Sequence, residues 1–339
     1  MDESELLTRA RAGDTAAFDG LVARYRGELK AHCYRMLGSP QDAEDGLQET
    51  LLAAWRGLPG FEGRSSLRTW LYRISTNACL RLASKRPRRV LSPDHGPPRG
   101  DVHDLGDWVR GPVFLEPWPD DAAAGPSASE ADPAASFARR ENVELAFVAA
   151  LQHLPATQRA VLILREVLEF SAAEVASFLD LTPVAVNSAL QRARKAVQER
   201  VPPATQQTEL SALGPDGRRD LIDAFVAAWE RSDVDALVTL LADDVRFTMP
   251  PLPAWFDGRD DVVRFLTKRV FQTPWRLRPV QANGQPAFAC YQRNPDGRFL
   301  IGSITVLSVR DGRITRLSSF LDPALYPLFG LPEEFPPDR

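Results

Sequence analysis

The sequence has 339 residues, a formal net charge of −4, and 44% hydrophobic against 25% charged side chains. This length predicts two or three domains, and the composition is that of a folded protein rather than of a disordered one. It contains no long apolar run and no apolar leader, so we expect neither a membrane span nor export and place the protein in the cytoplasm. The three cysteines, Cys33, Cys79 and Cys290, show no ligand spacing, so we expect no disulfide, no metal site and no cofactor.

Charge is distributed unevenly along the chain. Eight basic residues and no acidic residue lie between Arg64 and Val90. From Leu91 to Ser136, nine acidic residues stand against Arg99 and Arg110. A nucleic-acid partner would therefore contact particular segments of this protein, not its whole surface.

Residues 1–88 predict a helical domain with clear start and stop signals. Asp14 is a suitable N-cap for one amphipathic helix, which Gly38 ends. Ser39, followed by proline, starts a second helix. Ser66 can cap a third helix, which Pro87 ends.

Two faces of these helices carry polar side chains at helical spacing. On the second helix they are Asp42, Asp45, Gln48 and Glu49, which indicate either a solvated acidic face or a docking surface for a basic partner. On the third helix, cations, an aromatic ring and an amide suit melted or single-stranded nucleic acid. These residues are Arg68, Trp70, Arg73, Asn77 and Arg81, and the alternative is again a solvated helix.

Residues 89–136 are rich in Pro, Gly, Asp and Ala and predict an acidic linker. Such a segment is either a plain tether or a mimic of a phosphate backbone that occupies a positively charged channel. We expect helices again over residues 137–202.

The segment from Ser171 to Gln198 predicts a helix-turn-helix. Ser171 and Glu174 form a capping box, and Thr182 starts a longer helix. An antiparallel helix pair without DNA would share this apolar pattern. The outer face of the longer helix offers groups for base edges and phosphates: Asn187, Ser188, Gln191, Arg192, Arg194 and Lys195.

Residues 215–335 predict an α+β domain, in which two helices precede five strands. The turns at residues 294–297 and 310–312 join the later strands into antiparallel hairpins. Several large apolar side chains are candidates either to line a pocket or to fill a core: Phe225, Trp229, Phe247, Met249, Trp255 and Tyr291.

Several of these motifs, in this order, resemble the extracytoplasmic-function sigma factors of the sigma-70 family. They are Asp42-Ala43-Glu44-Asp45 with Gln48-Glu49, Arg68-Thr69-Trp70-Leu71 with Asn77-Ala78, and Leu154-Pro155 with Arg192-Ala193-Arg194. The C-terminal domain resembles the SnoaL-like branch of the NTF2-like cone through element order and through Asp243-Asp244-Val245 and Trp255-Phe256-Asp257-Gly258-Arg259. The implied fold has two all-α sigma domains, a region 2 bundle and a region 4 helix-turn-helix, followed by this cone.

The resemblance implies that the acidic helix docks on the β′ clamp of core RNA polymerase. It implies that the third helix reads the minus-ten element and that the helix-turn-helix reads the minus-thirty-five element near the β flap. Asn187-Ser188-Ala189 stands where many members carry an arginine-rich triplet, which leaves the preferred promoter open. We expect no enzyme, with the C-terminal domain regulating the other two and binding a small apolar ligand.

Two alternatives remain at this level. The first is a ligand-responsive regulator that binds operators without polymerase. The second is a SnoaL-like enzyme with a helical appendage, against which stands the position of all four histidines before residue 154.

Overall fold

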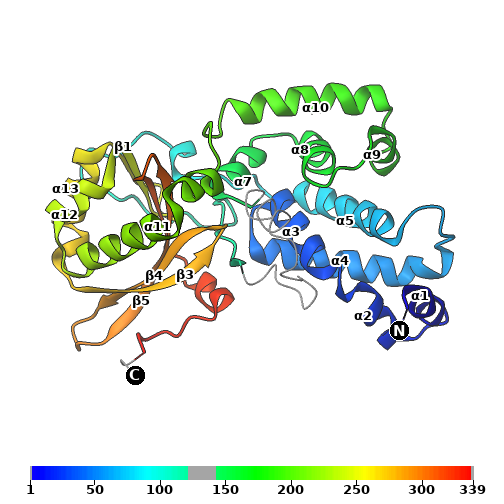
Figure 1. Ribbon diagram of the computed structural model, residues 1–339, viewed down its shortest axis with the longest axis horizontal. Helices are drawn as coiled ribbons and strands as arrows, with labels where there is room; N and C mark the ends of the chain where they lie inside the picture. Colours follow the sequence, from blue (N-terminus) through cyan, green and yellow to red (C-terminus); the bar gives the residue numbers. More distant parts are fainter. Residues whose placement is uncertain (1, 121–142, 337–339) are drawn as a thin grey trace. The chain divides into compact units, whose positions relative to one another are not determined.

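Residues 2–120 and 143–336 of the 339 are described by the computed structural model, in which the chain forms two compact units (Figure 1). The helical unit consists of Met1–Arg89 and Asp120–Val201. The sheet unit consists of Val90–Pro119 and Pro202–Arg339. The chain therefore leaves the helical unit, contributes to the sheet unit, returns, and leaves again.

The helical unit contains two groups of helices. The first bundle is α1 Glu3–Arg11, α2 Thr15–Ala23, α3 Arg26–Leu37, α4 Pro40–Gly57 and α5 Leu67–Ala83. The second bundle is α7 Leu145–Gln152, α8 Ala156–Leu162, a π-helical turn Ile163–Val167, α9 Ala172–Leu179 and α10 Pro183–Gln198.

Local signals set the starts of these helices as the sequence predicts. The side chains of Asp14, Ser39, Ser66, Ser171 and Thr182 each accept a hydrogen bond from a backbone N–H in the first turn of the helix that follows. These bonds satisfy donors that a helix N-terminus otherwise leaves unpaired.

The single helix predicted between Asp14 and Gly38 is wrong. The chain turns between Ala23 and Arg26, where Tyr25 N donates to Val22 O over 2.9 Å, and continues as a separate helix. The apolar spacing runs on across this break, because both helices bury a face in the same core. Periodicity alone does not reveal such a change of direction.

The sheet unit is built on a six-stranded sheet in the order β2-β1-β6-β5-β4-β3. Its strands are β1 Leu241–Thr248, β2 Trp255–Asp257, β3 Trp275–Ala282, β4 Gln285–Arg293, β5 Phe299–Arg310 and β6 Arg313–Phe320. Its helices are α11 Gln206–Glu230, α12 Val234–Leu240 and α13 Arg259–Lys268. The predicted hairpins β4–β5 and β5–β6 are confirmed, whereas β1 pairs with β6 in parallel, which was not predicted.

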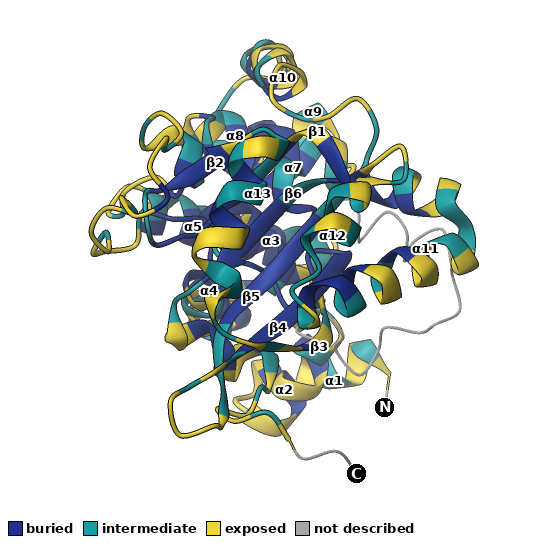
Figure 2. Ribbon diagram, turned by 90° about the vertical axis from the view of Figure 1, so that its left-hand side faces the viewer, coloured by how far each residue is buried: buried dark blue, intermediate teal, exposed yellow. Residues whose placement is uncertain are grey.

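The three helices α11–α13 cover one face of this sheet, and the dark blue strands behind them in Figure 2 are largely buried. The apolar cluster between the layers joins Phe225 of α11, Leu237 of α12 and Phe265 of α13 to Phe288 and Leu317 of the sheet. Burial of this cluster supplies the main stabilisation of the unit.

Val90–Pro119, which we call the strap, packs on the sheet unit. Arg99 N donates to Trp255 O over 2.8 Å, and Val109 N donates to Pro251 O over 3.1 Å. Val102 is 4% exposed and belongs to the apolar cluster of the unit. The structure thus differs from the flexible tether that we expected over residues 89–136, whose part from 121 onward lies outside the described residues.

Candidate protein and nucleic-acid interfaces

The helix-turn-helix is formed by α9 and α10. The capping box of Ser171 and Glu174 is complete, since each side chain accepts from the backbone N–H of the other. Asp180 ends α9 in the left-handed conformation with φ of 54°, and α10 begins three residues later. This tight turn fixes the second helix across the first, as base readout in a groove requires.

The two faces of α10 separate as the sequence predicts. Val186, Leu190, Ala193 and Val197 are buried in the second bundle. The predicted minus-thirty-five residues fall outside this buried stripe: Asn187, Gln191, Arg192, Arg194 and Lys195 are exposed, and Ser188 is half-buried. Arg194 is ion-paired with Glu166, whereas Arg192 projects into solvent.

The predicted minus-ten residues lie along α5 with unequal exposure. Arg73 and Arg81 are exposed, and Arg68, Trp70 and Asn77 are half-buried. The ring of Trp70 lies 4.9 Å from that of Phe61, and Arg81 lies 3.9 Å from Glu49 of the neighbouring helix α4. The five residues therefore lie on one helix, but only two of them are fully accessible to a partner.

The predicted acidic face of α4 needs a correction at Asp42. The residue is 6% exposed, and its side chain is paired with Arg86 and with Arg89, whose Nη2 lies 2.8 Å from Asp42 Oδ2. Asp42 stands in the first turn of α4, where the chain beyond α5 passes and supplies these arginines. The carboxylate is thus a structural group, and only Asp45, Gln48 and Glu49 remain accessible on this face.

Sequence reasoning assigned Arg86 and Arg89 to a basic stretch and missed their structural role. Arg86 Nη2 also reaches Asp45 Oδ2 over 2.9 Å, so one arginine bridges two carboxylates of α4. A pairing over more than forty positions leaves no mark in local periodicity.

The six residues that were candidates either to line an apolar pocket or to fill a core lie in the interior of the sheet unit. All six are buried, and Phe225, Trp229, Phe247 and Met249 belong to its apolar cluster. Tyr291 donates its hydroxyl hydrogen to Pro332 O over 3.2 Å and packs against Phe335. An apolar ligand would have to displace these side chains.

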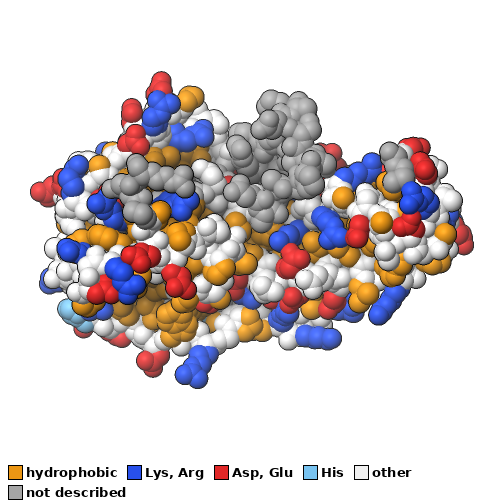
Figure 3. Space-filling view, turned by 90° about the horizontal axis from the view of Figure 1, so that it is seen from below, with side chains coloured by type: hydrophobic (Ala, Val, Ile, Leu, Met, Phe, Trp, Pro, Cys, Tyr) orange, Lys and Arg blue, Asp and Glu red, His pale blue; other side chains and the backbone are white. Residues whose placement is uncertain are grey.

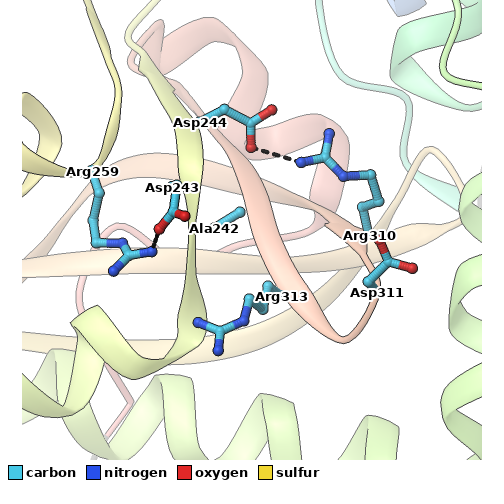
Figure 4. A pocket seen from close by; sticks show the side chains of 7 residues that line it. All are labelled: Ala242, Asp243, Asp244, Arg259, Arg310, Asp311 and Arg313. Atoms are coloured by element: carbon cyan, nitrogen blue, oxygen red, sulfur yellow. Dashed lines mark hydrogen bonds and ion pairs between the residues drawn. The ribbon is translucent and has the colours of Figure 1, made fainter.

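A hollow of about 450 Å³ on this unit is lined mainly by charged side chains (Figure 4). Asp244 accepts from Arg310 over 2.7 Å, and Asp243 pairs with Arg259, so most of these charges neutralise one another. This pairing lowers the pKa of Asp244, chiefly through the hydrogen bond from Arg310. Four of the six charged side chains that line the hollow are thus paired with one another.

Charge on the surface is mixed. On the face in Figure 3, basic and acidic side chains are interspersed, in keeping with the net charge of −4. Within the described residues, no group of acidic, histidine or cysteine side chains is arranged to hold a metal ion, and no helix is long and apolar enough to cross a membrane.

Comparison with known proteins matches three family models to these parts. Sigma-70 region 2 matches residues 21–89, Sigma-70 region 4 matches residues 144–197, and the SnoaL-like domain matches residues 222–317. The ECF RNA polymerase sigma factor SigG of Mycobacterium tuberculosis is 44% identical over 328 residues, covering 95% of this chain and 85% of the relative. The chain belongs to the ECF RNA polymerase sigma factors. The ECF RNA polymerase sigma-E factor of Escherichia coli K12 is 29% identical over 203 residues, covering 60% of this chain and 96% of that protein.

The fold of this ECF sigma factor is similar to the crystal structure of the ECF sigma factor SigJ of M. tuberculosis. The TM-score is 0.58 at 24% identity, covering 91% of this chain and 97% of the other. Region 2 lies in the first bundle, region 4 in the second bundle, and the SnoaL-like domain in the sheet unit. The predicted family and fold class are thus confirmed.

Proposed function

We propose that this ECF sigma factor binds core RNA polymerase through Asp45, Gln48 and Glu49 of α4 and directs it to promoters. The three side chains lie on one side of a helix whose other side is buried in the first bundle. Acidic and amide groups in this arrangement suit a basic surface, for which we propose the β′ clamp. Such a role places the protein in the cytoplasm, where the polymerase works.

Promoter recognition is assigned to α5 and α10. The exposed cations Arg73 and Arg81 of α5 can hold phosphates of the minus-ten element, and Asn77 and Trp70 can meet its bases. Asn187, Gln191 and Arg192 of α10 can reach base edges in the major groove of the minus-thirty-five element, near the β flap. The geometry of α9 and α10 is the observation that supports this assignment best.

The SnoaL-like domain is proposed to be a regulator without chemistry of its own. Its interior is filled by its own side chains and by Val102 of the strap, and all histidines of the chain precede it. The strap connects directly to the end of region 2, since Val90 follows Arg89. By holding or releasing the strap, the domain would change the length of free chain between region 2 and the rest of the protein.

Run-off transcription with purified core polymerase and the full chain tests this proposal. We expect promoter-dependent transcripts that disappear when core polymerase or the sigma factor is omitted. Joint replacement of Asp45, Gln48 and Glu49 by alanine should abolish core binding, whereas joint replacement of the exposed Glu5, Asp19 and Glu62 by alanine should not. Loss of the transcript only with the second set, or no transcript at all, would refute the assignment.

A further inference from the structure

Region 4 contacts residues of α5 that we assign to promoter recognition. The guanidinium carbon of Arg68 lies 4.9 Å from the ring centre of Tyr72 and 5.2 Å from that of Phe170. Arg68 and Tyr72 belong to region 2, and Phe170 precedes α9 in region 4. The ring of Phe170 also stands 5.5 Å from that of Tyr72 in an edge-on arrangement.

A second contact involves the amide of the same helix. Asn77 Nδ2 donates to the backbone oxygen of Phe178, at the end of α9, over 3.5 Å. Arg68 and Asn77, two of the five predicted minus-ten residues, are therefore half-buried in contact with region 4, and these contacts compete with DNA for the two side chains.

Side chains of region 4 also donate hydrogen bonds to backbone carbonyl groups at the C-terminal end of α3. The last carbonyl groups of a helix have no donors within the helix and carry partial negative charge. Gln152 Nε2 donates to Arg35 O over 3.1 Å, and Arg159 Nη1 donates to Met36 O. Two side chains of region 4 thus complete a helix of region 2.

The same two side chains are joined within region 4. Arg159 Nη1 donates to Gln152 Oε1 over 2.6 Å, and Arg159 Nη2 donates to the backbone oxygens of Gln152 and Leu154. Arg159 is 6% exposed, and burial, with a smaller contribution from Arg88, lowers its pKa to about 10.

Burial of Arg159 leaves one of its hydrogen-bond donors unsatisfied. Its Nε has no hydrogen-bond partner among the described residues, and an unsatisfied buried donor opposes the contact that creates it. Opening the contact would return this guanidinium to water, so the closed arrangement is stable but can be reversed.

We propose that Gln152, Arg159 and Phe170 form a latch that holds region 4 on region 2 and shields the minus-ten surface of α5 until the sigma factor engages polymerase. The proposal rests on the assignment of α5 to promoter recognition. Bound to a promoter, α5 needs Arg68 and Asn77 for DNA, so the latch is open in that state. The partner that replaces region 4 on α5 is the melted, negatively charged DNA strand.

The variant Gln152→Glu isolates the latch from the fold of region 4. A carboxylate still accepts from Arg159, but it cannot donate to Arg35 O and repels that oxygen. Gln158→Glu adds the same charge on the adjoining helix and is the matched control. Loss of a buried hydrogen bond that leaves its acceptor unsatisfied should shift the equilibrium toward the open form on the order of ten-fold.

Fluorescence energy transfer between the two regions measures this shift in the full chain. Because Cys33, Cys79 and Cys290 are buried, dyes can be attached selectively through Ser84→Cys after α5 and Gln198→Cys at the end of α10. We expect lower transfer for Gln152→Glu than for the parent and for Gln158→Glu, and several-fold more transcript at limiting core polymerase. Gln152→Leu should give the same direction.

Two outcomes would overturn the latch. Energy transfer that is the same for Gln152→Glu and the parent would show that the contact does not hold the regions together. Reduced transfer without any gain in transcript would show that the contact does not restrain activity. If no variant and no parent chain supports transcription, the proposed function itself fails, and the transfer measurement still reports whether the latch exists.

Discussion

Replacement of Val102 by aspartate should release the middle of the strap, around residues 99–109, from the rest of the sheet unit. The side chain of Val102 lies in the apolar cluster of that unit, while its neighbours Asp101 and His103 are exposed. On either side of it the strap is held by hydrogen bonds from Arg99 N to Trp255 O, from Val109 N to Pro251 O and from Trp255 Nε1 to Gly96 O. Val102 is therefore the apolar anchor of the middle of the strap, whereas the buried Leu115 and Trp118 hold its C-terminal end.

The size of the effect follows from burial. Full burial of a valine side chain stabilises by about 1.5–3 kcal/mol, and an unpaired buried carboxylate would add a further penalty. The segment around Val102 should open instead of burying the charge. Since about 1.4 kcal/mol corresponds to a factor of ten, amide hydrogen exchange at Arg99 and Val109 should accelerate about ten- to hundred-fold.

His103→Asp introduces the same charge one residue further along the strap, where the side chain is exposed, and should leave exchange unchanged. Amides in the centre of the sheet, such as that of Ile304, should exchange at the parent rate in both variants. Unchanged exchange in Val102→Asp would show that this side chain does not anchor the strap. Faster exchange throughout the sheet would show that the strap cannot separate from the fold of the unit.

Three further predictions concern other residues. Asp42→Ala removes the carboxylate that pairs with Arg89, whose side chain is 6% exposed, and should lower the free energy of unfolding by about 3–5 kcal/mol in urea titration. An unchanged midpoint would contradict the structural role of the pair. Arg192→Ala should weaken the minus-thirty-five footprint by about five- to hundred-fold, and Arg194→Ala less, because Arg194 already forms an ion pair; the reverse order would mean that α10 docks differently. Burial lowers the pKa of His32 from 6.5 to about 3, so the fold requires a neutral ring, and stability should fall as the pH drops from 6.5 toward 3. This loss amounts to at most about 1.4 kcal/mol per pH unit, and His32→Gln should flatten it in unfolding measurements between about pH 6 and 4; parallel profiles would refute the assignment.

The buried pair of Asp42 with Arg89 changes how the acidic motif of α4 is understood. Residues that stand together in the motif divide into a structural group at Asp42 and an accessible group from Asp45 onward. Arg86 links the two, since it pairs with both carboxylates. Substitutions in this motif will therefore affect stability at one position and docking at the others.

Several features of this protein are determined by short stretches of sequence. The N-caps at Ser39, Ser66 and Ser171 were predicted because a cap needs only the three or four residues that follow it. The hairpin between β5 and β6 follows from Asp311 and Gly312, both of which have positive φ as a two-residue turn requires. The outward face of α10 follows from its apolar spacing.

Other features depend on residues that meet only in the folded chain. Val102 lies in a segment whose composition predicts a linker, and only the surface around Trp255 and Pro251 gives it a place to bind. Arg159 reaches Met36 across 123 positions, and neither neighbourhood records the contact. The side chains of a segment show which kinds of group it can contact. Which residues it does contact depends on the tertiary packing. For this reason the sequence determined the capped helix starts, the hairpin turns and the family, and the tertiary structure decided where α2 ends and α3 begins, and which of the predicted surfaces are exposed.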